Sequence, residues 1–92
     1  MVKRNRIDII EDMLRLMSER KGVKKTHLMY KSNLSHRQLT SYLEELVGKD
    51  FVEKTQNKNC EYILITPNGR KFLDKIREMK EFESAFGLGN LP

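Results

Sequence analysis

Residues 32–39 read Ser-Asn-Leu-Ser-His-Arg-Gln-Leu, and this stretch decides how two helices are joined. Ser35 and Gln38 have the spacing of a capping box, in which two side chains bond backbone N–H groups that the first turn of a helix leaves free. Leu34 and Leu39 occupy the two positions of a hydrophobic staple, which fixes the angle at which the chain enters a helix. We therefore expect a helix from Ser35 to about residue 49, directly after a short turn.

Two helices are predicted before this turn. Residues 6–20 place apolar side chains at helical spacing, and Gly22 suits the left-handed position that often follows a helix. Thr26 is expected to cap a short helix over residues 27–31, carrying Leu and Met side chains inward. Residues 32–33, a Ser-Asn pair, should end this helix because both residue types favour turns and caps.

After the second long helix, the apolar period changes from about 3.6 to 2, which is typical of strands. Residues 51–55 and 60–65 are predicted strands, and the polar residues 56–59 between them form a turn. The two strands therefore form a hairpin.

The hairpin is followed by a long predicted helix. Thr66 suits its N-cap, and Pro67 suits its first position, where a missing N–H costs nothing. A helix over residues 67–86 is about 30 Å long, so it should extend beyond the rest of so small a domain. We expect its apolar stripe to form a homodimer interface; alternatively, the end of the helix frays or folds back. The stripe consists of Phe72, Ile76, Met79, Phe82 and Phe86.

Helix, short helix, helix, hairpin and long helix in this order are typical of a winged helix-turn-helix. The predicted fold class is α+β and mostly helical, with a long C-terminal dimerisation helix. The 92 residues suffice for a single domain. Its expected parts are a basic arm (1–5), the winged helix-turn-helix (6–66, with the wing at about 51–65), the dimerisation helix (67–86) and a tail (87–92).

The net charge is +5, from 18 basic and 13 acidic residues. Residues 1–31 hold nine basic and four acidic residues, whereas the remaining residues are balanced in charge. The excess therefore lies outside the helix that begins at Ser35. Such a charge permits a polyanionic partner and favours attraction to a phosphate backbone over reading of a base sequence.

Several classes of function lack support in the sequence. No apolar run is long enough for a membrane span and no signal peptide is recognisable, so we expect a cytoplasmic, nucleoid-associated protein without a membrane partner. Cys60 is the single cysteine, and we expect it to be a packing residue rather than a redox sensor. His27 and His36 lack metal-ligand partners at suitable spacing. We therefore predict no enzyme, no cofactor, no metal and no small-molecule ligand.

Two segments, residues 24–53 and 62–76, resemble the archaeal winged helix-turn-helix family of DNA-binding transcriptional regulators. Its members include small, basic, archaeal ten-kilodalton proteins that dimerise through their C-terminal helices. The resemblance covers roughly residues 6–80 and implies DNA binding by the helix after Ser35 and by the wing, with antiparallel pairing of the C-terminal helices. The matching elements are Met29-Tyr30, Asn33-Leu34-Ser35, Leu39 with Tyr42-Leu43, and Ile65 to Leu73.

Candidate DNA-binding residues follow from this arrangement. Arg37 lies in the first turn of the presumed reading helix, where an arginine can reach guanine O6 and N7 together; the alternatives are a phosphate contact or a solvated side chain. Weaker polar contacts are expected from other residues of that helix. They are Ser35, His36, Gln38, Thr40 and Ser41.

Basic residues elsewhere are candidates for phosphate contacts, which position a protein on DNA without reading sequence. Lys24, Lys25 and Lys31 flank the short helix, and a plain solvated face is their alternative role. Lys54 and Lys58 lie on the wing, which has no arginine. The expected arm residues Lys3, Arg4 and Arg6 either attract DNA or belong to a frayed, solubilising terminus.

Two functions remain open from the sequence. The first is sequence-specific or architectural binding of double-stranded DNA by a homodimer, most simply as a transcriptional regulator. The second is a winged helix that contacts another protein and no DNA, which the near-neutral residues 32–59 keep open. Tyr30 and Tyr42 are expected to pack within the domain in either case.

Overall fold

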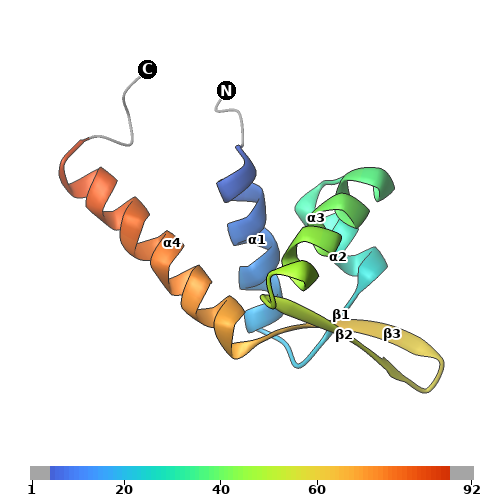
Figure 1. Cartoon of the computed structure of the whole chain (residues 1–92). Helices are drawn as coiled ribbons and strands as arrows, with labels where there is room; N and C mark the ends of the chain where they lie inside the picture. The colour runs from blue at the N-terminus through green and yellow to red at the C-terminus, as the bar shows by residue number, and fades with distance from the viewer. Residues whose placement is uncertain (1–4, 88–92) are drawn as a thin grey trace.

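The predicted helices and hairpin are present in the computed structural model, which describes residues 5–87, and one further short strand joins the hairpin (Figure 1). Strand β1 lies at one edge of the sheet, whose order is β1-β3-β2, and both pairings are antiparallel. The elements are α1 (Arg6–Ser18), β1 (Val23–Lys24), α2 (Lys25–Ser32), α3 (His36–Gly48), β2 (Val52–Asn57), β3 (Cys60–Ile65) and α4 (Pro67–Ala85).

The turn between α2 and α3 forms as its sequence predicts. Asn33 adopts the left-handed conformation at the end of α2, with φ of 55°, and its N–H and that of Leu34 donate to carbonyls of the last turn. The side chain of Ser35 accepts from the N–H of Gln38, whose side chain accepts from the N–H of Ser35. The predicted capping box is therefore confirmed. Leu34 is buried between the two helices, which holds the turn against the core.

The predicted start of α2 is wrong. Thr26 lies within the helix, whose N-cap is Lys24 and has no side-chain cap. The reason is β1: Val23 pairs with Ile63 of β3, so the chain stays extended as far as Lys24 and turns helical immediately afterwards. A strand of two residues has no periodicity of its own, and its pairing partner lies far along the chain.

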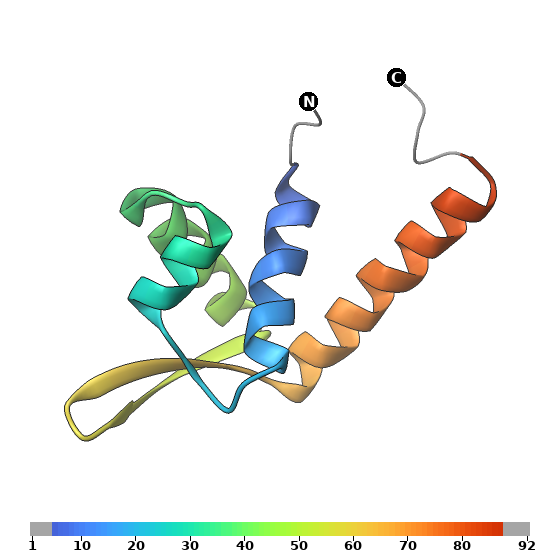
Figure 2. The same ribbon diagram turned by 180° about the vertical axis from the view of Figure 1, so that it is seen from behind.

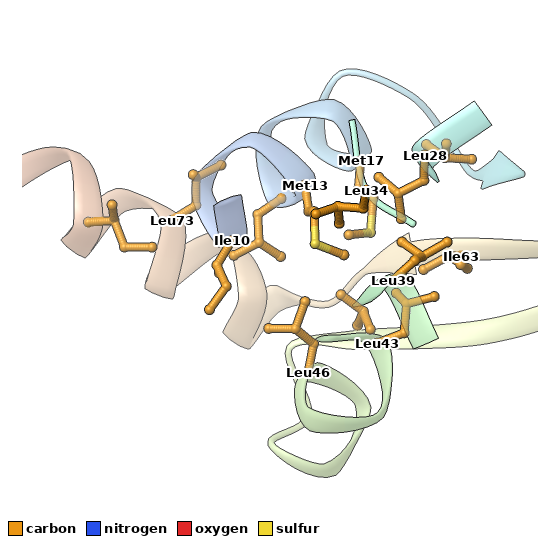
Figure 3. Close-up of a cluster of buried hydrophobic side chains, with 14 residues drawn as sticks. Ile10, Met13, Met17, Leu28, Leu34, Leu39, Leu43, Leu46, Ile63 and Leu73 are labelled. Atoms are coloured by element: carbon orange, nitrogen blue, oxygen red, sulfur yellow. The ribbon is translucent and has the colours of Figure 1, made fainter. Parts of the chain in front are cut away.

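The core fills the space between α1, the α2–α3 pair and the inner end of the hairpin (Figure 3). Each helix contributes an apolar face, and β3 contributes Ile63, which is fully buried. The buried apolar residues are Ile10, Met13, Leu14, Met17, Val23, Leu28, Leu34, Leu39, Leu43, Leu46, Val52, Ile63, Leu73 and Ile76.

The wing is a regular hairpin that projects from this core. Its register runs from Val52 opposite Ile65 to Asn57 opposite Cys60. The turn consists of Lys58 and Asn59, both with positive φ, as a tight hairpin turn requires. The strands therefore continue further toward the tip than the predicted turn over residues 56–59 allowed. Beyond Val52, every residue of β2 is exposed.

Helix α4 begins as predicted, with Thr66 accepting from the N–H of Gly69 and Pro67 in the first turn. Its first turns pack on the core, and beyond them it diverges from the body. Helix α1 separates α4 from the α2–α3 pair in both views (Figures 1 and 2). None of the helices described is long and apolar enough to cross a membrane.

Candidate nucleic-acid interface

Helix α3 presents a polar, exposed face opposite its buried Leu39, Leu43 and Leu46. Arg37 and Ser41 lie one turn apart on this face, and both are exposed. An arginine and a hydroxyl at this spacing can reach neighbouring groups of a ligand that lies along the helix.

Most of the other candidate DNA-binding residues of α3 take part in hydrogen bonds at the start of the helix. Ser35 and Gln38 bond each other's backbone N–H groups, and the hydroxyl of Thr40 donates to the carbonyl of His36 at 2.9 Å. Because the side-chain oxygen of Gln38 is used, its amide NH2 group remains for a partner. His36 is exposed beside Arg37 in the first turn.

Arg6 does not belong to an arm with Lys3 and Arg4, contrary to that prediction, because it is the first residue of α1, where the predicted helix over residues 6–20 also begins. Asn5 caps this helix, with its side chain accepting from the N–H of Asp8. The guanidinium of Arg6 forms an ion pair with Glu45 of α3, and it lies 5.6 Å from the ring centre of Tyr42. The start of α1 is thus tied to α3. The other two predicted arm residues, Lys3 and Arg4, lie outside the described residues.

The remaining lysines predicted to contact phosphates lie at different places in the structure. Lys24 and Lys25 lie together where β1 meets α2, whereas Lys31 lies in the last turn of α2, at the other end of that helix. Lys54 and Lys58 are exposed on β2 and at the tip of the wing. Lys24 pairs in register with Tyr62 of β3, so Lys24 and Lys25 lie beside the middle of the hairpin. In Figure 1, the α2–α3 pair and the wing project to the same side of α1, away from α4.

Tyr30 departs from its predicted role. Its side chain is 81% exposed, although the sequence led us to expect packing within the domain. Helix α2 has eight residues and buries Leu28 and Ser32, so Tyr30 falls on the opposite side. Tyr42 is half-buried and packs against the core, as expected.

The apolar stripe of α4 has two parts. Ile76 is buried in the core of its own chain, and Phe72 stacks on Phe51 with ring centres 4.5 Å apart, so these two side chains of the predicted dimer interface have partners within the chain itself. Further along, Met79 is 44%, Phe82 58% and Phe86 68% exposed. The last two rings lie 4.7 Å apart. These three side chains form an exposed apolar patch at the far end of α4.

The histidines and the cysteine of the described chain do not form a metal site. Among residues 5–87, no three His, Cys, Asp or Glu side chains are placed to hold a metal ion. His36 is exposed on α3, and His27 lies partly buried on α2, where its Nε2 has no hydrogen-bond partner among the residues that the structure describes. Cys60 is half-buried at the start of β3.

Comparison with known proteins identifies the family. A sequence model described as winged helix-turn-helix matches residues 3–84, nearly the whole chain. The chain belongs to this family. The winged helix-turn-helix thus comprises the elements from α1 to most of α4. The predicted α+β fold, with its hairpin and long C-terminal helix, is confirmed.

Similar proteins come from archaea. The uncharacterized protein MJ0290 of Methanocaldococcus jannaschii is 35% identical over 78 residues, which are 85% of this chain and 35% of that protein. The chain thus spans about a third of that relative's length. The resemblance to archaeal winged helix-turn-helix proteins is thereby confirmed.

Two solved archaeal structures share the fold. Sso10a-2, a DNA-binding protein from Sulfolobus solfataricus, superposes with a TM-score of 0.77 at 20% identity over 90% of this chain and 85% of its own. The transcriptional regulator BldR from Sulfolobus solfataricus has a TM-score of 0.76 at 19% identity over 90% of this chain and 61% of its own. At these identities, the likeness concerns the arrangement of helices and hairpin.

Proposed function

We propose that this protein binds double-stranded DNA as a homodimer and acts as a transcriptional regulator. It would thus be a nucleoid-associated binding protein rather than an enzyme. The observation that carries this proposal is the exposed polar face of α3, which begins at a complete capping box and bears Arg37 in its first turn. The descriptions of Sso10a-2 as a DNA-binding protein and of BldR as a transcriptional regulator support it.

In this proposal, α3 lies in the major groove, as the second helix of a helix-turn-helix does. The guanidinium of Arg37 bonds guanine O6 and N7, a contact that distinguishes guanine from the other bases. Ser41, one turn further along, contacts an adjacent base or phosphate. Glu44 marks the point at which the helix leaves the groove, because its carboxylate repels phosphate.

Lysines around this helix bind the DNA backbone in the same proposal. Lys24 and Lys25 contact phosphates beside the middle of the hairpin. Lys54 and Lys58 of the wing contact the neighbouring stretch of backbone. Each such contact releases a condensed counterion, so binding weakens steeply with salt.

Dimerisation is proposed through the far end of α4. Met79, Phe82 and Phe86 are exposed there, and a second copy of the same helix would cover them. Such an interface leaves the α2–α3 pair and the wing of each copy accessible, because α1 separates them from α4. A dimer of this kind presents two reading helices to two half-sites.

Titration of fluorescent DNA duplexes with the protein, followed by anisotropy across a salt series, tests DNA binding. We expect tight binding at low salt and a linear fall of log affinity with log salt concentration. The absence of duplex binding at low salt would overturn the proposal and favour the protein-interaction alternative.

Selection of bound sequences from a random library then separates two modes of binding. A sharp motif is the result expected of a regulator that reads bases. Broad recovery without a motif would mean an architectural protein instead.

A further inference from the structure

A small hollow lies between the first turn of α1 and the exposed side of α3. Its volume is about 320 Å³, several times the share of one water molecule in the liquid, which is roughly 30 Å³. It therefore has room for a phosphate group. Its lining residues are Arg6, Arg37, Gln38, Ser41, Tyr42 and Glu45.

The polar groups around this hollow are mostly hydrogen-bond donors. Arg6 and Arg37 supply guanidinium N–H groups, and Ser41 and Tyr42 supply hydroxyls. Gln38 adds its amide NH2, because its side-chain oxygen already accepts from the N–H of Ser35. Planar guanidinium groups match the geometry of phosphate oxygens. The lining is thus suited to an anion with several acceptor oxygens.

The acidic residue in the lining is already neutralised. Glu45 forms its ion pair with Arg6, which also lies over the ring of Tyr42. These two contacts hold the guanidinium at the edge of the hollow, so it loses less freedom when it binds a ligand. A guanidinium has more N–H groups than one carboxylate oxygen can use, and the side chain of Arg6 remains 62% exposed.

We propose that this hollow receives a backbone phosphate of the DNA that α3 reads, with Arg6 as the residue that binds it. The inference rests on the proposed function, because Arg37 and Ser41 belong both to the hollow and to the reading face of α3. DNA lying on that face brings its backbone along the side where α1 begins. The DNA interface therefore extends from the helix-turn-helix and wing to α1.

The test compares the salt dependence of duplex binding in two variants. Arg6→Ala should lower the slope of log affinity against log salt concentration by about 0.9 per bound copy, the value for a single phosphate neutralised by the protein. Affinity at low salt should fall about tenfold, as for one charge-assisted hydrogen bond. Circular dichroism checks that the exposed substitution leaves the fold intact.

Arg15→Ala is the matched control. Arg15 is also an exposed arginine of α1 in an ion pair with an acidic residue, Asp12, at 3.1 Å, so its removal changes the net charge equally. The proposal expects almost no change of slope for Arg15→Ala. Equal slopes for the two variants would overturn it, because the effect of Arg6 would then be one of general charge.

Arg6→Ala in a Glu45→Gln background separates a phosphate contact from a purely structural role of the ion pair. Because Glu45→Gln already breaks that ion pair, the effect left to Arg6→Ala is the loss of the phosphate contact, and the salt slope should again fall by about 0.9. An unchanged slope in this background would overturn the phosphate contact. Failure of the unsubstituted protein to bind any duplex would instead overturn the proposed function itself.

Discussion

At the scale of single residues, some side chains of α3 stabilise the helix, and others are free to contact DNA. Ser35 and Gln38 are used to start α3, and Thr40 bonds back to its own helix. Arg37 and Ser41 lie on the exposed side. Within residues 5–87, their side chains form neither a capping hydrogen bond nor a hydrogen bond to the backbone of their own helix. The two roles are therefore assigned to different residues, and they can be changed separately.

Arg37→Ala should cost about 1–3 kcal/mol of binding free energy on the preferred sequence and relax the preference at one base pair. Arg37→Lys is the control for charge, since lysine keeps the charge but lacks the planar fork. Selection from a random DNA library, followed by affinity measurements on the selected site, checks both. A motif unchanged in Arg37→Ala would mean that this arginine contacts phosphate.

Replacement of Lys24 and Lys25 by alanine should weaken binding to all sequences alike, because phosphate contacts carry no sequence information. The salt slope should fall by about 0.9 for each phosphate that the variant no longer neutralises. Anisotropy titrations on a selected site and on an unrelated duplex test this. Weakening confined to the selected site would contradict the assignment of these lysines to the backbone.

At the scale of elements, hydrogen bonds and a close backbone contact connect the segment after α3 to the start of α4. The hydroxyl of Thr66 donates to the carbonyl of Asp50 at 2.5 Å, and the side-chain amide of Asn68 donates to the carboxylate of Asp50 at 3.0 Å. Gly69 lies so close to Phe51 that an added Cβ would stand 2.1 Å from its carbonyl oxygen. These contacts set the direction in which α4 leaves the body.

Gly69→Ala should therefore destabilise the fold by about 3 kcal/mol, because neither the backbone of Phe51 nor α4 can move without disturbing the core. Gly48→Ala is the matched control. It lies at the exposed end of α3 with nothing within 4 Å of an added Cβ, so it should stabilise by about 0.5 kcal/mol. Urea unfolding measures both, and equal effects would contradict the close approach at Gly69.

Two ion pairs connect α4 to α1. The ammonium of Lys80 lies 2.5 Å from carboxylate oxygens of both Asp8 and Glu11. Hydrogen bonds to these two carboxylates raise the pKa of Lys80 above its usual 10.5, and burial opposes them. Because the folded-state pKa is the higher one, the stabilisation is complete below about pH 10.5 and is lost as the pH rises through the raised pKa.

Lys80→Met should lower the free energy of unfolding by about 0.5–1 kcal/mol near neutral pH, a modest effect since the side chain is 37% exposed. The difference from the unsubstituted protein should shrink as the pH rises through the raised pKa. Lys75→Met is the control, because Lys75 pairs with Glu78 on the same helix and is 77% exposed. Urea unfolding at neutral and strongly alkaline pH measures the difference, which should be nearly absent in the control.

At the scale of the whole molecule, the proposed DNA-binding side and the proposed dimer side are separated by α1. The chain extends 48 Å along its longest axis, and α4 forms one arm of this shape (Figure 1). Two copies joined through the far ends of α4 would form a single body with two reading helices. Binding of one half-site then raises the effective concentration of the second helix at the other.

Replacing Met79 and Phe82 by alanine should convert a dimer to a monomer, since it removes much of the exposed apolar surface of α4. DNA affinity should fall by about 10²-fold or more, because a monomer binds one half-site without a linked second helix. Sedimentation and anisotropy measure the two effects. Arg77→Ala, at another exposed position of the same helix, should change neither. An unsubstituted protein that is monomeric at micromolar concentration would contradict the dimer.

The sequence by itself determined the boundaries that depend on neighbours along the chain. The capping box at Ser35, the end of α2 at Ser32-Asn33 and the Thr66-Pro67 start of α4 act over a single turn, so residue types and their spacing suffice to predict them. The left-handed position expected at Gly22 is wrong, since α1 ends at Ser18 with Glu19 as its C-cap and Gly22 does not have a positive φ. The change of apolar period located the hairpin for the same reason. The helix-turn-helix and its wing could therefore be predicted from local sequence.

Tertiary structure alone decided the features whose partners are distant in sequence. Strand β1 exists because Val23 meets Ile63, and Arg6 is held by Glu45, 39 residues further along. Ile76 continues the apolar stripe of α4 but packs in its own core, while Tyr30 is exposed because α2 packs by its other face. Periodicity shows which side of a helix is apolar. What covers that side depends on how the helices pack in three dimensions.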